Sequence, residues 1–204
     1  MRKLIASYSL TEGIQIIVTV NAILSRLHQK SEKKNKRIAG KKTVEQSILE
    51  CLKEVNTNTD RFVEDTSITN KSSISFMLEY KGIRSIFLGD SHPSDVIVAL
   101  KSRQLPNYRI NVVKLSHHAS HKNTNKELIE LLGKTEYIVC ADKSHHGHPN
   151  NKTISRILAF NSDAKFHLSS DNEPLRDMFA DCVRCGHSIA VTYPKEGINR
   201  LCYE

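Results

Sequence analysis

The stretch that decides the fold runs from Ile110 to Ser120 and reads INVVKLSHHAS. Its first half is short, apolar and rich in β-branched side chains, which predicts a buried strand from Ile110 to Leu115. Two histidines, His117 and His118, follow where that strand ends. A strand that ends on chemically competent side chains is typical of a ligand site at the edge of a sheet.

The same pattern recurs on both sides of this stretch. The strand predicted from Ile83 to Leu88 runs into Gly89-Asp90, and the strand predicted from Tyr137 to Ala141 runs into a segment that contains His148. A helical pattern follows each strand end, so we expect a layered α/β domain. The carboxyl ends of neighbouring strands then meet at one edge, where ligands bind in such folds.

Histidines are concentrated in this part of the chain. Of the ten histidines, seven lie between positions 92 and 148. Imidazole and carboxylate groups bind Zn, Mn or Fe, and the two oxygens of Asp90 are able to bridge a pair of such ions. Each signal alone also fits an ordinary turn or a surface histidine. Together, at three consecutive strand ends, they favour a metal site.

The rest of the chain continues the α/β pattern. We expect a hairpin of two strands joined at Lys81-Gly82, and a helix opened by Thr43 as its N-cap. Further strands are predicted over residues 14–20, 165–168 and 188–193, and further helices over residues 22–29, 127–132 and 150–160.

Composition excludes several classes of protein. The chain has 204 residues, of which 39% are hydrophobic, which fits one folded domain rather than a disordered or fibrous chain. Its apolar runs are shorter than the roughly 18 residues that span a bilayer, and its start lacks a signal-peptide core. Five cysteines, an odd number, do not suggest a disulfide framework. We therefore expect a cytoplasmic protein without membrane contact.

The net charge of +8 is concentrated in one segment. Residues 26–42 contain eight Lys or Arg residues and one Glu. This run lacks interleaved aromatic residues, and we interpret it as a solvated linker rather than a face that binds phosphates.

Four motifs, taken in order, carry a family resemblance. They are Asp65-Thr66-Ser67-Ile68-Thr69-Asn70-Lys71-Ser72-Ser73-Ile74, Phe87-Leu88-Gly89-Asp90, Lys114-Leu115-Ser116-His117-His118-Ala119-Ser120 and Gly147-His148-Pro149. This series resembles the later motifs of the metallo-β-lactamase fold, and most of all the hydrolase-like domain of the DNA-uptake competence channel and its free-standing relatives. The resemblance implies an αββα sandwich with one or two divalent ions, Zn or Mn, at one edge.

The resemblance also implies roles for individual residues. It implies that Asp90 is the bridging metal ligand and that His148 is the histidine of the last motif; it implies metal or substrate contacts for the pair His117-His118, of which we favour His118 as the metal ligand beside Asp90 and His148. It implies that Asn70, Ser73 and His117 contact the substrate or stabilise developing charge. The implied reaction is hydrolysis of a phosphoester or related bond, and nucleic acid is the substrate class that this branch suggests.

Two departures from the family pattern limit this interpretation. The early His-x-His-x-Asp-His loop is absent, since His28 is the only histidine before position 92. We therefore expect residues 65–204 to form only the second half of the sandwich, and residues 1–64 to contribute a strand, helices and the basic linker. Ala119 stands where the family usually has Gly, so a positive φ at that position would strain the loop.

Two functions follow from this sequence. The first is a metal-dependent hydrolase present as an incomplete domain, which would not hold its ions firmly by itself. The alternative is a non-catalytic remnant or binding module, which associates with a partner that supplies the missing half. Half a sandwich would expose apolar surface around Phe76 and Phe87, so we expect self-association or an N-terminal half-domain as partner.

The cysteines near the C-terminus suggest one further site. Cys182 and Cys185, with His187 and Cys202, resemble half of a zinc knuckle. The spacing of the second pair is poor for zinc, and reduced thiols are the simpler interpretation.

Overall fold

The computed structural model describes residues 3–10, 14–21, 45–102, 109–144 and 146–203, and for the first two ranges it describes the backbone only. The predicted helix over residues 22–29, the basic run and Thr43 lie outside the described residues. The strands are β1 Lys3–Leu10, β2 Ile14–Asn21, β3 Ser75–Tyr80, β4 Ile83–Phe87, β5 Val112–Lys114, β6 Glu136–Val139, β7 Lys165–Leu168 and β8 Ala190–Thr192. The helices are α1 Ile48–Asn56, α2 Ile68–Lys71, α3 Pro93–Ser102, the 3₁₀ turn η1 Ser116–Ala119, α4 Lys126–Leu132, α5 Asn151–Phe160 and α6 Glu173–Arg184.

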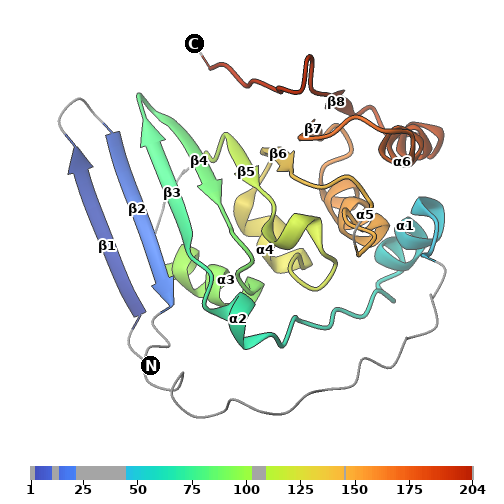
Figure 1. Cartoon of the computed structure of the whole chain (residues 1–204). Coiled ribbons are helices and arrows are strands. Elements are labelled where there is room, and N and C mark those ends of the chain that lie inside the picture. The colour runs from blue at the N-terminus through green and yellow to red at the C-terminus, as the bar shows by residue number, and fades with distance from the viewer. Residues whose placement is uncertain (1–2, 11–13, 22–44, 103–108, 145, 204) are drawn as a thin grey trace, which may run out of the picture.

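All eight strands form one sheet whose order follows the chain. The pairs from β1 to β4 are antiparallel, and the pairs from β4 to β8 are parallel. Crossovers between parallel strands are almost always right-handed, so strands added in one direction place their helices on the same face. Figure 1 shows α3, α4, α5 and α6 together on one side of the sheet. The described part of the chain is therefore a sheet with one layer of helices.

The core lies between the sheet and these helices. Tyr137 and Phe166 on adjacent strands are fully buried and stack with ring centroids 5.6 Å apart. From the helical side, Ile154, Ile157 and Leu158 of α5 are buried against the same face. No helix of the described residues covers the other face of the sheet, to which the alternate side chains of each strand point (Figure 1).

Local capping signals set the helix ends. Ser47 begins α1 with a capping box, because its side chain accepts from the Glu50 amide while the Glu50 carboxylate accepts from the Ser47 amide. Asn125 caps α4, which coincides with the helix predicted over residues 127–132. Asn172 caps α6, a helix that the sequence analysis did not predict.

The expectation of a mixed α/β protein is confirmed. Because β2 pairs with β3, the two predicted segments, residues 1–64 and 65–204, contribute to the same sheet. The αββα sandwich stays a prediction, since the described residues form a single sheet covered by helices on one face. Among the described helices, none combines the length and apolarity that crossing a bilayer requires.

A buried arginine holds the helical layer to the loops. The Arg156 side chain on α5 is only 2% exposed, and it pairs with Asp60 through Nε at 2.6 Å and Nη2 at 3.0 Å. Its Nη1 donates to the carbonyl oxygens of His121 at 2.6 Å and Thr124 at 2.7 Å. Burial alone would raise the pKa of Asp60, but the hydrogen bonds and charge of Arg156 hold that pKa below its usual range. Three separate segments are therefore joined at one guanidinium.

We expect Arg156→Met to lower the free energy of unfolding by about 3 kcal/mol, because it leaves two carbonyl groups without their donor and leaves the Asp60 carboxylate with Lys152, 3.4 Å away, as its cationic partner. Urea denaturation followed by circular dichroism measures the loss. Arg176→Met is the matched control, since Arg176 makes the same bidentate pair with Asp171 on the surface, where its side chain is 58% exposed. An equal loss in both variants would contradict this assignment.

Candidate functional site

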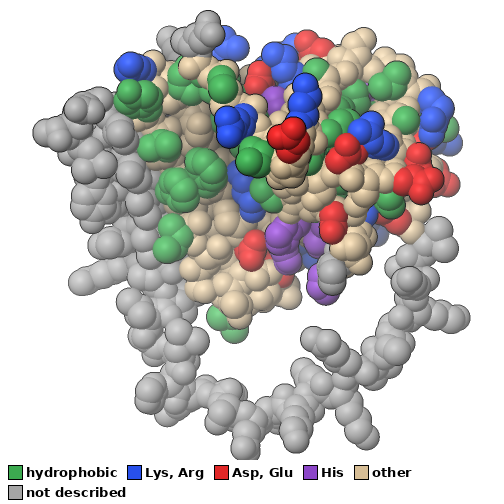
Figure 2. Space-filling view, turned by 45° about the horizontal axis from the view of Figure 1, so that its top comes forward, with side chains coloured by type: hydrophobic (Ala, Val, Ile, Leu, Met, Phe, Trp, Pro, Cys, Tyr) green, Lys and Arg blue, Asp and Glu red, His purple; other side chains and the backbone are tan. Residues whose placement is uncertain are grey.

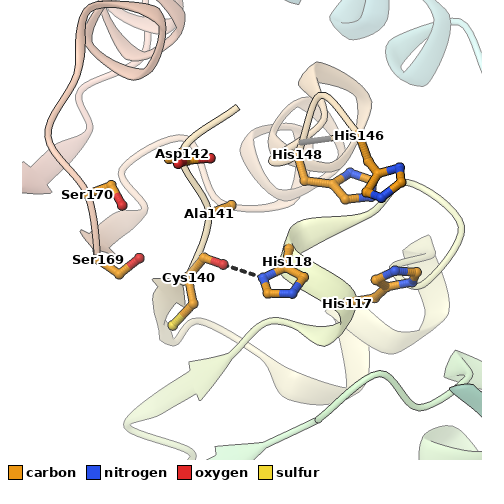
Figure 3. A pocket seen from close by; sticks show the side chains of 9 residues that line it. All are labelled: His117, His118, Cys140, Ala141, Asp142, His146, His148, Ser169 and Ser170. Carbon is orange, nitrogen blue, oxygen red and sulfur yellow. Dashed lines mark hydrogen bonds between the residues drawn. The ribbon is translucent and has the colours of Figure 1, made fainter. Parts of the chain in front are cut away.

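The loops that follow β5, β6 and β7 enclose one cavity at the carboxyl edge of the parallel strands. Its volume is about 330 Å³, the lower end of the range for small-molecule sites. It is lined by His117, His118, Cys140, Ala141, Asp142, His146, His148, Ser169 and Ser170. Figure 3 shows the four histidines on one side of this cavity and the two serines on the other. Three predicted site residues, His117, His118 and His148, are thus brought together.

A left-handed turn brings neighbouring histidines to the same cavity. His117, His118 and Ala119 have φ values of 44°, 56° and 64°. In an extended strand, consecutive side chains would point to opposite faces, but this turn lets both histidines line the cavity. The His117 amide donates to the Gly89 carbonyl at 2.9 Å, and the Ser116 hydroxyl donates to the Ser91 carbonyl at 2.8 Å. These bonds hold the turn against the loop that follows β4.

Ala119 has the positive φ that the sequence analysis named as a source of strain. It is fully buried, and a left-handed conformation costs a non-glycine residue roughly 1 kcal/mol. The surrounding hydrogen bonds sustain this backbone, including one from the Asn150 amide to the Ala119 carbonyl at 3.2 Å. The site loop therefore stores backbone strain next to the histidine pair.

In two of these histidines, His118 and His148, the Nδ1 atom has an oxygen partner. Nδ1 of His118 contacts the Cys140 carbonyl, and Nδ1 of His148 lies 3.1 Å from Oδ1 of Asn150. An Nδ1 that donates to an oxygen leaves Nε2 with its lone pair, which is how proteins prepare an imidazole to bind a cation or accept a proton. Burial, and then the nearby His117, lower the pKa of His148 to about 4, so this ring is neutral at pH 7.

The histidine rings lie close together. The centroids of His117 and His148 are 5.4 Å apart, those of His146 and His148 are 6.2 Å apart, and those of His117 and His118 are 6.3 Å apart. Two imidazoles on one tetrahedral zinc have centroids roughly 5 Å apart. His146 belongs to this group although the sequence analysis assigned it no role. Its place in the same His-Gly-His segment as His148 was the available signal.

The structure places the other predicted site residues outside the lining of this cavity. The main chain of Asp90 is held from two sides, since its amide donates to the Ser73 hydroxyl at 2.9 Å and its carbonyl accepts from Asn123 at 3.3 Å. The Ser73 hydroxyl thus holds the main chain of the Gly89-Asp90 turn in place. Asn70 lies behind His117, with its Nδ2 3.3 Å from Nδ1 of that ring.

The donor set for a metal pair is incomplete. Among the residues that the structure describes, no group of three or more His, Cys, Asp or Glu side chains is arranged to hold a metal ion. Imidazoles are present, but Asp90 does not line the cavity with them. The residues described therefore do not fit the predicted one- or two-ion site without further ligands.

The cysteine motif does not supply a second site. Cys182 is fully buried in the core on α6, where its thiol lies 3.3 Å from the Met178 carbonyl. Burial raises the pKa of this thiol to about 12, so it stays protonated and is a poor metal ligand. Cys185 is partly buried and Cys202 is exposed.

Fold and site together define a mixed α/β protein with a histidine-lined cavity at the carboxyl edge of its parallel strands. Comparisons of the chain with models of protein families, with curated proteins and with solved structures find no match. The function is therefore inferred from the residues and their geometry.

The Gly89-Asp90 turn provides a test of how closely the site loops are packed. Gly89 has a φ of 55°, and a Cβ there would lie 2.5 Å from the Ser73 hydroxyl and 2.8 Å from the Ile74 carbonyl. We expect Gly89→Ala to cost roughly 1 kcal/mol for the positive φ and a further 1–3 kcal/mol for the clash, as measured by urea denaturation.

Gly82→Ala is the matched control for this substitution. Gly82 has a φ of 80° in the turn between β3 and β4, but no atom lies within 4 Å of an added Cβ. It should show only the conformational cost. Equal losses at the two positions would mean that Ser73 does not pack closely beneath the turn.

Proposed function

We propose that this chain is the C-terminal part of a metal-dependent hydrolase of the metallo-β-lactamase fold, acting on phosphoester or related bonds, and that its site needs further ligands. The observation that carries this proposal is the meeting of His117, His118 and His148 in one cavity. These residues come from motifs on two separate loops, and the motif order suggested such a meeting. Nδ1 of His118 and of His148 is turned to an oxygen, which suits rings that present Nε2 to a ligand.

The proposed roles divide between the two sides of the site. His118 and His148, with Asp90, would contribute to holding Zn or Mn in the completed enzyme, and the chain by itself lacks the donor set for that chemistry. His117 is proposed to contact the substrate, while Asn70 lies behind its ring and Ser73 holds the turn that carries Asp90. Nucleic acid is the proposed substrate class because of the family resemblance.

A specific observation also favours the second function, a binding module that pairs with a partner. On the sheet face opposite the helices, Phe76 and Phe87 are register partners whose rings stack with centroids 4.7 Å apart. Tyr80 lies four residues after Phe76 on β3, so its side chain is on the same face of the hairpin, and it is 42% exposed. Figure 2 shows hydrophobic side chains gathered in one region of the surface and histidines gathered in another. An apolar face of this kind suits an N-terminal half-domain or a second copy.

Metal analysis of the purified chain tests the first function. We expect less than about half an equivalent of Zn or Mn, because the chain alone has too few ligands for a firm site. Addition of a separate N-terminal half that carries the His-x-His-x-Asp-His motif should raise the metal content and produce phosphodiesterase activity. In that complex, Asp90→Ala and His118→Ala should each remove the metal, and its retention in both variants would refute the proposed ligands.

Sedimentation tests the second function. We expect the chain to self-associate through the sheet face opposite the described helices, and Phe76→Ser to weaken that association because it removes half of the partly buried aromatic stack on that face. Val183→Ser is the control, since Val183 is an apolar residue on α6 that is 56% exposed. A monodisperse monomer that unfolds cooperatively would count against an open binding face.

A further inference from the structure

A polar network lies behind His117, on the side of the ring away from the cavity. Its centre is Asp65, whose side chain is 12% exposed. The carboxylate is held firmly, because Oδ1 accepts from the Ser67 amide at 2.9 Å and Oδ2 accepts from the Asn70 side chain at 2.6 Å. A second imidazole, the buried His92, has its Nε2 4.0 Å from the same oxygen. Asp65 is the first residue of the first of the four sequence motifs, where it has no assigned role.

Three polar atoms surround Nδ1 of His117. Oδ2 of Asp65 lies 3.5 Å away, Oδ1 of Asn123 lies 3.3 Å away, and Nδ2 of Asn70 lies 3.3 Å away. The two oxygens would accept a proton carried by Nδ1, whereas the Asn70 nitrogen would donate to a bare Nδ1. The two arrangements correspond to the two tautomers of a neutral ring.

The hydrogen bonds of the side-chain amides of Asn123 and Asn70 indicate which tautomer is favoured. Asn123 is fully buried, and its Nδ2 faces the carbonyl oxygens of Asp90 at 3.3 Å and Ser91 at 3.4 Å, so its Oδ1 is the atom turned to His117. Asn70 already donates to Asp65 at 2.6 Å, the shorter of its two contacts. Asn70 keeps a second amide hydrogen, so the assignment rests on the acceptors: two of them, one a charged carboxylate, face Nδ1 against a single neutral donor.

The charge state of Asp65 agrees with this assignment. Burial would raise the pKa of the carboxyl group, but hydrogen bonds from Asn70, Ser67 and Asn123 hold that pKa below its usual range. The carboxylate beside the ring is therefore ionised at neutral pH and favours a proton on Nδ1.

We propose that Asp65 is a positioning residue that keeps the proton of His117 on Nδ1 and leaves Nε2 unprotonated for the cavity. The His117 side chain is 30% exposed and lines that cavity, so the part of the ring away from Asp65 is open to a ligand. This inference deepens the proposed function and rests on it for the chemistry. An Nε2 lone pair allows His117 to accept a proton from a substrate or bind a cation, which an Nε2–H tautomer does not.

The tautomer of His117 can be read directly from ring ¹H–¹⁵N correlation spectra of the full chain at about pH 9, where an imidazole is in its neutral form, with the His117 signals assigned by their absence in His117→Gln. We expect protonated Nδ1 and bare Nε2 in the unaltered protein. In Asp65→Asn the ratio of the Nδ1–H to the Nε2–H form should fall by about tenfold, the order expected when a charged acceptor is lost. Asp65→Glu keeps the carboxylate and should restore much of the ratio.

Asp142→Asn is the matched control, because Asp142 lines the same cavity on the side away from His117 (Figure 3). A shift there as large as in Asp65→Asn would overturn the proposal, and so would an Nε2–H tautomer in the unaltered protein. The tautomer of the unaltered protein is measured without any variant, so this measurement still tests the proposal if Asp65→Asn fails to fold. The spectra are recorded without metal or substrate, so the absence of hydrolysis would refute the proposed function while leaving this result intact.

Discussion

The buried guanidinium of Arg156 is the interaction on which the rest of the structure depends. It satisfies the Asp60 carboxylate and the carbonyl groups of His121 and Thr124, which are buried or partly buried. A buried cation is tolerated only when its donors are matched in this way. The consequence is that the segment before α2, the loop after η1 and helix α5 are held in one arrangement. The histidine turn of the candidate site lies at the start of one of these held loops.

The site depends on this arrangement because its strained backbone needs external support. Three consecutive left-handed residues, from His117 to Ala119, are unfavourable for an isolated chain. Hydrogen bonds from His117 to Gly89 and from Asn150 to Ala119 connect the turn to the loops after β4 and β6. The strain is thus sustained by packing and directs two adjacent rings into one cavity. Strained backbone that the surroundings hold in place is typical of functional sites.

Imidazole groups outnumber carboxylates among the residues that line the cavity. Imidazole rings gather there, and one of them, His148, is neutral because it is buried and lies near His117. Asp142 lines the cavity on the side away from His117 (Figure 3), whereas the two carboxylates of the quoted motifs, Asp65 and Asp90, take other positions. Asp65 stands behind His117, and Asp90 belongs to a turn that Ser73 and Asn123 hold outside the cavity lining. Such an arrangement suits a site whose imidazole rings orient a ligand.

The sequence by itself determined the alternation of strands and helices from β3 to α5 and the positions of histidines at strand ends, because hydrophobic period and turn residues are local signals. Helix α6 was also readable, since Leu175, Met178, Phe179 and Cys182 have helical spacing after the Asn172 cap. Only the tertiary structure decided which polar groups meet. The approach of Asp65 to His117, and the position of Asp90 outside the lining of the histidine cavity, depend on backbone φ values and on the packing of distant loops. Neither of these can be inferred from spacing along the chain.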